Sequence, residues 1–334
     1  MSPAPEEAAR PPRGRRIDFH VLGPVLALIA LVVLGTLING NFLSYGNITN
    51  VLSRSAFIGI IAVGMTFVIT AGGLDLSVGS MAAFIAGLMI LVMNAVLPAT
   101  GVGVLPVLIG MATALAAGLG AGLLNGLLVT RAGIEPFIVT LGTMGIYRSL
   151  VTWMADGGTL SLSFDLRGFY GPVYYGTVAG ISWPILVFAA VAVLGEIAMR
   201  RMPFGRHCAA IGASEKVARY SAVEVDRVRL ATYAVLGLLV GVATIMYVPR
   251  LGSASSATGL LWELEAIAAV IIGGTVLKGG SGRIWGTVVG VLILSLIGNI
   301  LNLTDMVSPY LNGAIQGAII ILAVLMQRGS AARE

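Results

Sequence analysis

The sequence predicts an all-α integral membrane protein of about ten transmembrane helices, and three observations support this fold class. Hydrophobic residues make up 57% of the chain and charged residues only 10%, against about 25% charged residues in a soluble domain. A soluble protein cannot bury that much apolar surface, whereas a bilayer solvates it. Apolar runs of about 20 residues, long enough to cross a membrane as helices, recur along the chain. The basic residues gather between these runs, which is typical of membrane topology and not of nucleic-acid binding.

Ten apolar segments define one predicted membrane domain, residues 21–327, between a basic N-terminal tail (1–20) and a C-terminal tail (328–334). Because lipid cannot satisfy backbone polar groups, each segment is expected to be a helix. The segments are 21–38, 51–71, 78–97, 104–129, 137–155, 181–199, 230–249, 263–277, 284–303 and 309–327. The segments 51–71 and 263–277 are the least regular and are candidates for partly re-entrant backbone. No small-residue cleavage site follows the first segment, so we expect it to be retained.

The basic residues also predict the orientation. With both termini inside, 16 of the 20 Lys and Arg residues fall on the inner side. The four on the outer side or in the outer half are Arg54, Arg148, Arg167 and Arg250. The positive-inside rule favours this N-in/C-in arrangement, in which both tails are cytoplasmic. Loop 156–180 then lies outside, and loop 200–229 lies inside.

Motifs for catalysis and metal binding are missing from the sequence. A Walker loop needs Lys followed by Ser or Thr, but Val217 follows Lys216 and Gly279 follows Lys278. The single cysteine, Cys208, excludes an intrachain disulfide and a cysteine zinc cage. We therefore expect no catalytic residue, metal or cofactor, and any nucleotide energy must come from another chain.

Two glycine patterns predict structure. Gly72 and Gly73 are expected to end the second helix, and Asp75 or Ser77 to cap the third; the alternative is a direct role for Asp75 in substrate binding or gating. In the fourth segment, small residues recur at every fourth position and predict a face for close helix packing. They are Gly110, Ala114, Gly118, Gly122 and Gly126.

Loop 200–229 contains a second capping signal. Ser214 is suited to cap a short helix that runs from Glu215 toward Ser221. Such a helix would form a docking knob for a soluble partner on the cytoplasmic side. The alternative is a solvated loop whose charges only fix the topology, and the residues by themselves leave both interpretations open.

Six stretches, in order, carry a resemblance to a known family. They are 61–69 (IAVGMTFVI), 72–80 (GGLDLSVGS), 125–129 (NGLLV), 136–144 (PFIVTLGTM), 204–206 (FGR) and 263–275 (ELEAIAAVIIGGT). Over nearly the whole length after residue 40, the chain resembles the ribose-type sugar permeases of bacterial ABC importers. Family members usually have Asp where Glu265 stands.

The resemblance implies a type II-like permease bundle in the bacterial inner membrane, with several partners. These are a cytoplasmic ABC ATPase pair, a periplasmic sugar-binding protein, a second permease copy or paralogue, and membrane lipid. It also implies that region 211–222 is the segment that couples the permease to the ATPase. The coupling residues expected there are Ile211, Gly212, Ala213, Ser214, Glu215, Ala218 and Arg219.

Polar residues within the apolar segments are candidates for the substrate path, because burying them in lipid is costly. They are Asn125, Thr143, Arg148, Glu265 and Asn299. Arg148 can instead extend outward or pair with Glu263 or Glu265, and each Asn can instead form an interhelical hydrogen bond. Arg167 and Arg250 are expected to meet acidic groups of the binding protein.

The expected function is to provide the path for a monosaccharide, a pentose or hexose, in an ATP-driven importer. One alternative keeps the importer but changes the cargo to a nucleoside or a branched-chain amino acid. An alternative of another class is an ion-coupled secondary transporter, but such carriers place acidic residues near the membrane midplane. Here the acidic residues lie near the ends of the segments.

Overall fold

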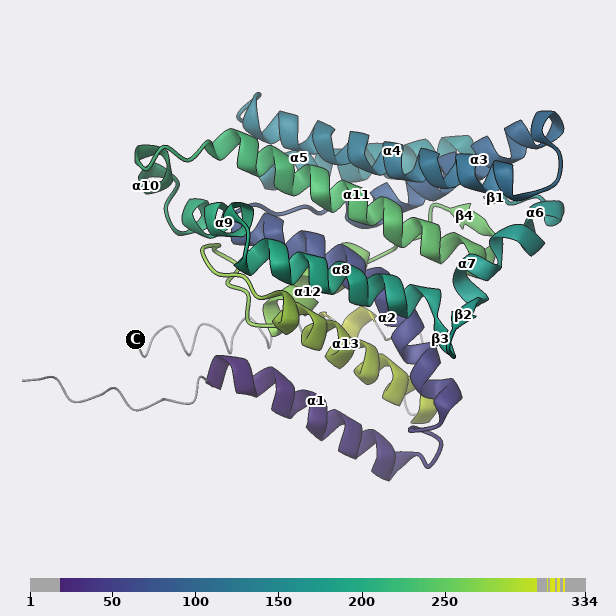
Figure 1. Ribbon diagram of the computed structural model, residues 1–334, viewed down its shortest axis with the longest axis horizontal. Helices are drawn as coiled ribbons and strands as arrows, with labels where there is room; N and C mark the ends of the chain where they lie inside the picture. Colours follow the sequence, from purple (N-terminus) through teal and green to yellow (C-terminus); the bar gives the residue numbers. More distant parts are fainter. Residues whose placement is uncertain (1–18, 305–310, 312, 316, 319–320, 322–334) are drawn as a thin grey trace, which may run out of the picture.

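A computed structural model describes residues 19–304, 311, 313–315, 317–318 and 321 (Figure 1). The predicted tenth segment, 309–327, and the two tails fall largely outside these residues. The other nine predicted segments are helical. They correspond to α1 (Phe19–Ile38), α2 (Tyr45–Thr70), α3 (Val78–Thr100), α4 (Val104–Thr130), α5 (Pro136–Met154), α8 (Trp183–Arg200), α11 (Val225–Leu251), α12 (Trp262–Ile272) and α13 (Ile284–Thr304).

Six helices in the described part of the chain are long and apolar enough to cross a membrane. They are α2, α3, α4, α8, α11 and α13. The fold is therefore that of an all-helical membrane protein.

The two segments that were expected to be irregular differ in the structure. Segment 51–71 is not re-entrant, because α2 is one continuous helix of 26 residues. Its residues from Ala56 to Thr70 are buried except Ile58, so α2 needs no polar face. Segment 263–277 is helical only as far as Ile272, because Gly273 and Gly274 follow and Gly274 has a φ of 86°.

The two ends of the bundle carry different short elements (Figure 1). At one end lie α9 (Pro203–Ala213) and α10 (Glu215–Tyr220). The opposite end has α6 (Phe164–Tyr170), α7 (Pro172–Tyr175) and two short antiparallel pairs. In these, β1 (Thr159–Ser161) pairs with β4 (Ser253–Ser255), and β2 (Thr177–Val178) pairs with β3 (Ile181–Ser182). Loops 156–180 and 200–229 thus lie at opposite ends, as predicted.

Close backbone contacts join α4 to α11 along the predicted face of small residues. A Cβ on Gly118 would lie 2.4 Å from the Gly237 oxygen, and a Cβ on Gly122 would lie 2.2 Å from the Tyr233 oxygen. The helices α12 and α13 meet in the same way, since a Cβ on Gly290 would lie 2.1 Å from the Ala269 oxygen. Any larger residue would push these helices apart.

Candidate functional site

A small apolar core fixes α10 to its neighbours at the α9–α10 end. Ile211 of α9, Ala218 of α10 and Val225 of α11 are buried against one another. The Ser214 hydroxyl accepts a hydrogen bond from the Val217 N–H at 3.4 Å, so the predicted cap and the predicted helix are both present. Two of the expected coupling residues, Ile211 and Ala218, therefore face inward and hold the segment in place.

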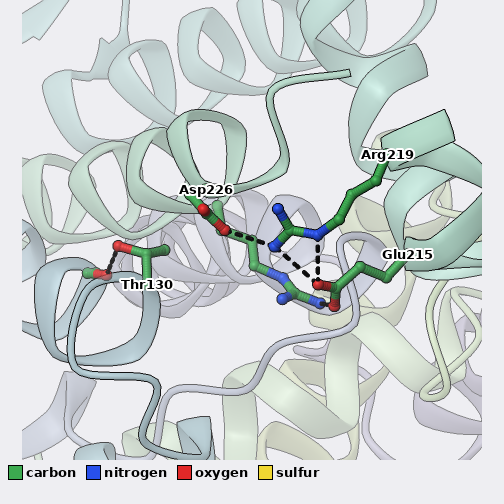
Figure 2. Close-up of polar contacts among 6 residues, drawn as sticks. Thr130, Glu215, Arg219 and Asp226 are labelled. Carbon is green, nitrogen blue, oxygen red and sulfur yellow. Dashed lines mark hydrogen bonds and ion pairs between the residues drawn. The ribbon is translucent and has the colours of Figure 1, made fainter. Parts of the chain in front are cut away.

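An ion-pair cluster secures the same segment (Figure 2). Arg219 contacts Glu215 at 3.0 Å and Asp226 at 2.8 Å, and Arg229 contacts Glu215 at 2.8 Å. Burial alone would raise the pKa of Glu215, but the hydrogen bond from Arg219 and the charge of Arg229 together lower it. The cluster thus keeps a carboxylate charged and ties α10 to the start of α11.

Two side chains that sequence analysis did not select form the outer surface of α10. Val217 is 60% exposed and Tyr220 is 80% exposed, and they lie three residues apart on one helical face. An exposed apolar pair beside charged groups is a typical contact for another protein. The spacing of Val217 and Tyr220 relative to the buried Ala218 is the signal that would have identified them.

A junction of glycines lies directly beside the end of α9. A Cβ on Gly212 would lie 2.0 Å from the Thr70 oxygen and 2.3 Å from the Gly280 nitrogen. A Cβ on Gly279 would lie 3.0 Å from the Gly72 backbone. The Gly280 N–H also donates to the Thr70 oxygen at 2.9 Å. The end of α9, the end of α2 and the α12–α13 loop therefore meet without intervening side chains.

The turn between α2 and α3 buries a carboxylate. Gly72 has a φ of 78°, as a helix stop requires, whereas Gly73 does not have a positive φ. Ser77 is the N-cap residue of α3, but its side chain makes no capping hydrogen bond, whereas Asp75, the other residue expected to cap, accepts the Ser77 N–H. The Ser77 hydroxyl instead donates to Asp75 at 2.6 Å, and the Ser77 N–H donates to the same oxygen at 2.8 Å.

Asn125 completes this buried network. Its Nδ2 donates to Asp75 at 3.0 Å and to the Ser77 hydroxyl at 2.9 Å. Asp75, Ser77 and Asn125 are all fully buried. Asn125 therefore serves as an interhelical contact from α4, one of the two roles that the sequence left open for it.

A polar cavity of about 320 Å³ lies between α2, α11, α12 and α13. Small-ligand sites range from about 300 to 1,000 Å³. Its lining combines aromatic rings with charged and amide groups. The lining residues include Asn50, Arg54, Phe57, Tyr247, Arg250, Trp262, Glu265, Asn299 and Asn302.

The five candidate path residues are not brought together. Glu265 and Asn299 line the cavity. Asn125 belongs to the Asp75 network, and Thr143 donates to the Thr140 oxygen at 3.3 Å within α5. Arg148 donates to the backbone oxygens of Ser256 and Thr258, which precede α12, at 2.5 and 2.7 Å. The cavity residues Arg54 and Trp262 were not selected from the sequence.

A second cavity, of about 280 Å³, lies at the α6–α7 end and includes both expected docking residues. Arg167 comes from α6 and Arg250 from the last turn of α11. Tyr175 of α7 donates to the Arg250 oxygen at 3.2 Å. Arg250 lines both cavities, so the two lie next to each other.

Known proteins are similar in sequence to this chain over most of its length. Residues 47–324 match the family described as "Branched-chain amino acid transport system / permease component". The chain belongs to this permease family. It is 39% identical to a ribose import permease protein of Bacillus subtilis, with 95% of this chain and 97% of the relative covered.

Two further relatives name other sugars. A D-allose transport system permease of Escherichia coli is 34% identical, with 91% of this chain and 90% of the relative covered. An L-arabinose ABC transporter permease of Azospirillum brasilense is 32% identical, with coverages of 98% and 94%. As a member of this family, the chain is a multi-pass membrane permease subunit and not an enzyme.

Proposed function

We propose that this permease imports a monosaccharide, a pentose or hexose, across the bacterial inner membrane. The observation that carries the proposal is near full-length similarity to permeases named for ribose, allose and arabinose. The cavity lined by aromatic, amide and charged groups suits a polyhydroxylated cargo. A cytoplasmic ABC ATPase supplies the energy, and a periplasmic binding protein delivers the sugar. Ion-gradient coupling, the alternative of another class, does not fit the permease family.

The proposed topology has about ten spans with both termini in the cytoplasm. The basic residues support it, because Arg200, Arg201 and Arg206 lie beside or within the α9–α10 end. Arg167 and Arg250 lie at the opposite end. The α9–α10 end is then cytoplasmic, and the α6–α7 end faces the binding protein.

The proposed coupling begins at α10. Val217 and Tyr220 enter a groove on the ATPase, and the ion-pair cluster makes α10 move as one body with the start of α11. The glycine junction passes the same movement to α2 and to the α12–α13 loop. Because these helices line the polar cavity, docking of the ATPase at α10 moves all the helices around the cavity. A second permease copy completes the core.

A branched-chain amino acid is the second candidate cargo. The family description names it, and the cavity offers both guanidinium and carboxylate groups to an amino acid's two charged ends. A nucleoside is a third, since its ribose and base suit the same polar and aromatic lining.

Reconstitution tests the function. The chain is placed in proteoliposomes with the ATPase and binding protein encoded beside it. Pentoses, hexoses, nucleosides and branched-chain amino acids are then compared for stimulated ATP hydrolysis and for accumulation on the ATPase side. A monosaccharide that does both supports the proposal. If only an amino acid or a nucleoside stimulates ATP hydrolysis, that compound replaces the monosaccharide as the proposed cargo. Transport without the ATPase would reject the importer assignment.

The coupling surface is tested by Val217→Asp with Tyr220→Asp. Charged groups on this face should block ATPase binding in pull-down experiments and abolish sugar-stimulated hydrolysis, while the permease still folds. Arg201→Ala is the matched control, because Arg201 is exposed at the same end but lies outside α10. Unchanged ATPase binding by the double variant would show that α10 is not the docking element.

A further inference from the structure

The polar cavity contains more charge than a lipid-facing surface tolerates. Arg54 lies in the first half of α2, within a helix long and apolar enough to cross a membrane, and Glu265 lies in α12. Charged side chains in such segments almost always face a water-filled space or a partner. Both line the same cavity. A cavity with this lining is suited to water or a polar cargo and not to lipid.

We infer that this cavity is a sugar-binding station within the permease, where an arginine and an aromatic wall hold a monosaccharide released by the binding protein. The inference rests on the proposed function and adds a site to it. It assigns to the permease a selectivity of its own, separate from that of the binding protein.

The aromatic wall consists of the partly exposed rings of Tyr247 and Trp262, and the buried ring of Phe57 supports them from behind. Phe57 and Trp262 are nearly parallel, with an interplanar angle of 13° and centroids 6.4 Å apart. Tyr247 stands perpendicular to both, at 5.3 Å from Phe57 and 4.9 Å from Trp262. Each ring thus holds the other two in place. The face of an aromatic ring is negative and attracts the weakly positive C–H groups of a sugar ring.

The polar wall suits neighbouring hydroxyl groups. Guanidinium groups of Arg54 and Arg250 offer paired donors, and the Glu265 carboxylate offers acceptors. Amide groups of Asn50 and Asn302 offer both. Asn299 has a different role, because its amide exchanges hydrogen bonds of 2.8 and 3.0 Å with Asn47. That pair clamps α13 to the start of α2 and fixes the rim of the station.

Arg250 connects the station to the α6–α7 end, where the binding protein is proposed to dock. It lines this cavity and also the cavity that contains Arg167. Tyr174 of α7 stacks on Phe57 with centroids 5.9 Å apart, so α7 also contacts the ring that supports the aromatic wall. A sugar released at the α6–α7 end would thus meet Arg250, which lines both cavities.

Fluorescence of Trp262 tests the station directly. The full-length permease in nanodiscs, without its partners, keeps Trp262 as its only tryptophan after Trp153→Phe, Trp183→Phe and Trp285→Phe. D-ribose, D-allose, L-arabinose and D-xylose are titrated. At least one sugar should shift the emission saturably, and Arg54→Gln should weaken that affinity tenfold or more. Arg201→Gln, which changes an exposed arginine at the far end, should leave it unchanged.

Separate outcomes distinguish the station from the function. If no sugar shifts the emission while the reconstituted wild-type importer accumulates sugar, the station is wrong and the function stands. If Arg54→Gln and Arg201→Gln weaken binding equally, the sugar binds elsewhere and the station is also wrong. If the wild-type importer moves no monosaccharide, the proposed function fails. If L-leucine, titrated in the same way, shifts the emission saturably and no sugar does, the sugar station is rejected.

Discussion

Asp75 has a carboxyl group without solvent contact, and its oxygens accept hydrogen bonds from its own turn and from α4. Asn125 supplies the one donor among these that comes from another helix. Removing that donor leaves a buried acceptor under-satisfied, which costs about 1–3 kcal/mol. Asn125→Leu should therefore lower the free energy of unfolding by that amount, measured by thermal or denaturant unfolding of the purified protein.

Thr113→Val is the control for this prediction on the same helix. The Thr113 hydroxyl donates only to the Ile109 oxygen of its own helix, at 2.9 Å. Its loss should change stability far less than Asn125→Leu. If the two variants are equally stable, Asn125 does not support the Asp75 turn.

Glu215 gives the stability of the α9–α10 end a pH dependence. Because its pKa is lowered from 4.5 in the folded protein, the ionised carboxylate stabilises the fold. This stabilisation is present above the unfolded pKa and is lost as pH falls through the folded pKa. Wild type should therefore melt higher than Glu215→Gln at pH 7, and the difference should close as pH falls below 4.5. A difference that stays constant would contradict the role of the cluster.

Residue-scale prediction succeeded where the signal was local. The Ser214 cap and the following helix needed only neighbouring residues. The Ser77 side chain does not cap α3, because its hydroxyl donates to the buried Asp75 at 2.6 Å. The sequence did not reveal that Arg54 and Trp262 share a cavity with Glu265, since that depends on the packing of four helices.

Two glycines in α4, Gly118 and Gly120, allow the effect of helix–helix packing on stability to be separated from the effect of helix propensity. Gly118 touches the α11 backbone, whereas nothing lies within 4 Å of a Cβ on Gly120. Gly118→Ala should destabilise the protein by about 1–3 kcal/mol through overpacking. Gly120→Ala should be neutral or stabilise by up to about 1 kcal/mol through helix propensity. Unfolding in mixed micelles measures both, and equal effects would mean that the face of small residues is not a contact.

Close packing at the glycine junction is also proposed to transmit movement from α9 to α2 and to the α12–α13 loop. Gly212→Ala places a methyl group against backbone atoms of Thr70 and Gly280, which cannot rotate away as a side chain can. The variant should still bind the ATPase through α10 but should lose most sugar-stimulated hydrolysis. If hydrolysis stays normal while the methyl group is tolerated, movement does not pass through this junction.

At the scale of elements, the positions of apolar segments were predictable and their internal breaks were not. Hydrophobic length located nine helices in the described part of the chain. The half-length of α12 follows from Leu261, which has a φ of 67°, and from the Gly273–Gly274 turn. The predicted start at residue 263 lies within one residue of the observed start, but the end at Ile272 was missed, because Val276 and Leu277 extend the apolar run beyond the two glycines.

The whole molecule has two chemically different ends, and the single buried cysteine makes their sidedness measurable. Cys208 has no exposed surface, so a membrane-impermeant maleimide should not label the wild type in intact cells. Thr177→Cys, at the exposed β2–β3 end, should be labelled from outside. Ser221→Cys, exposed just after α10, should be labelled only after the membrane is permeabilised. The reverse pattern would invert the topology, and with it the assignment of α10 to the ATPase and of Arg167 and Arg250 to the binding protein.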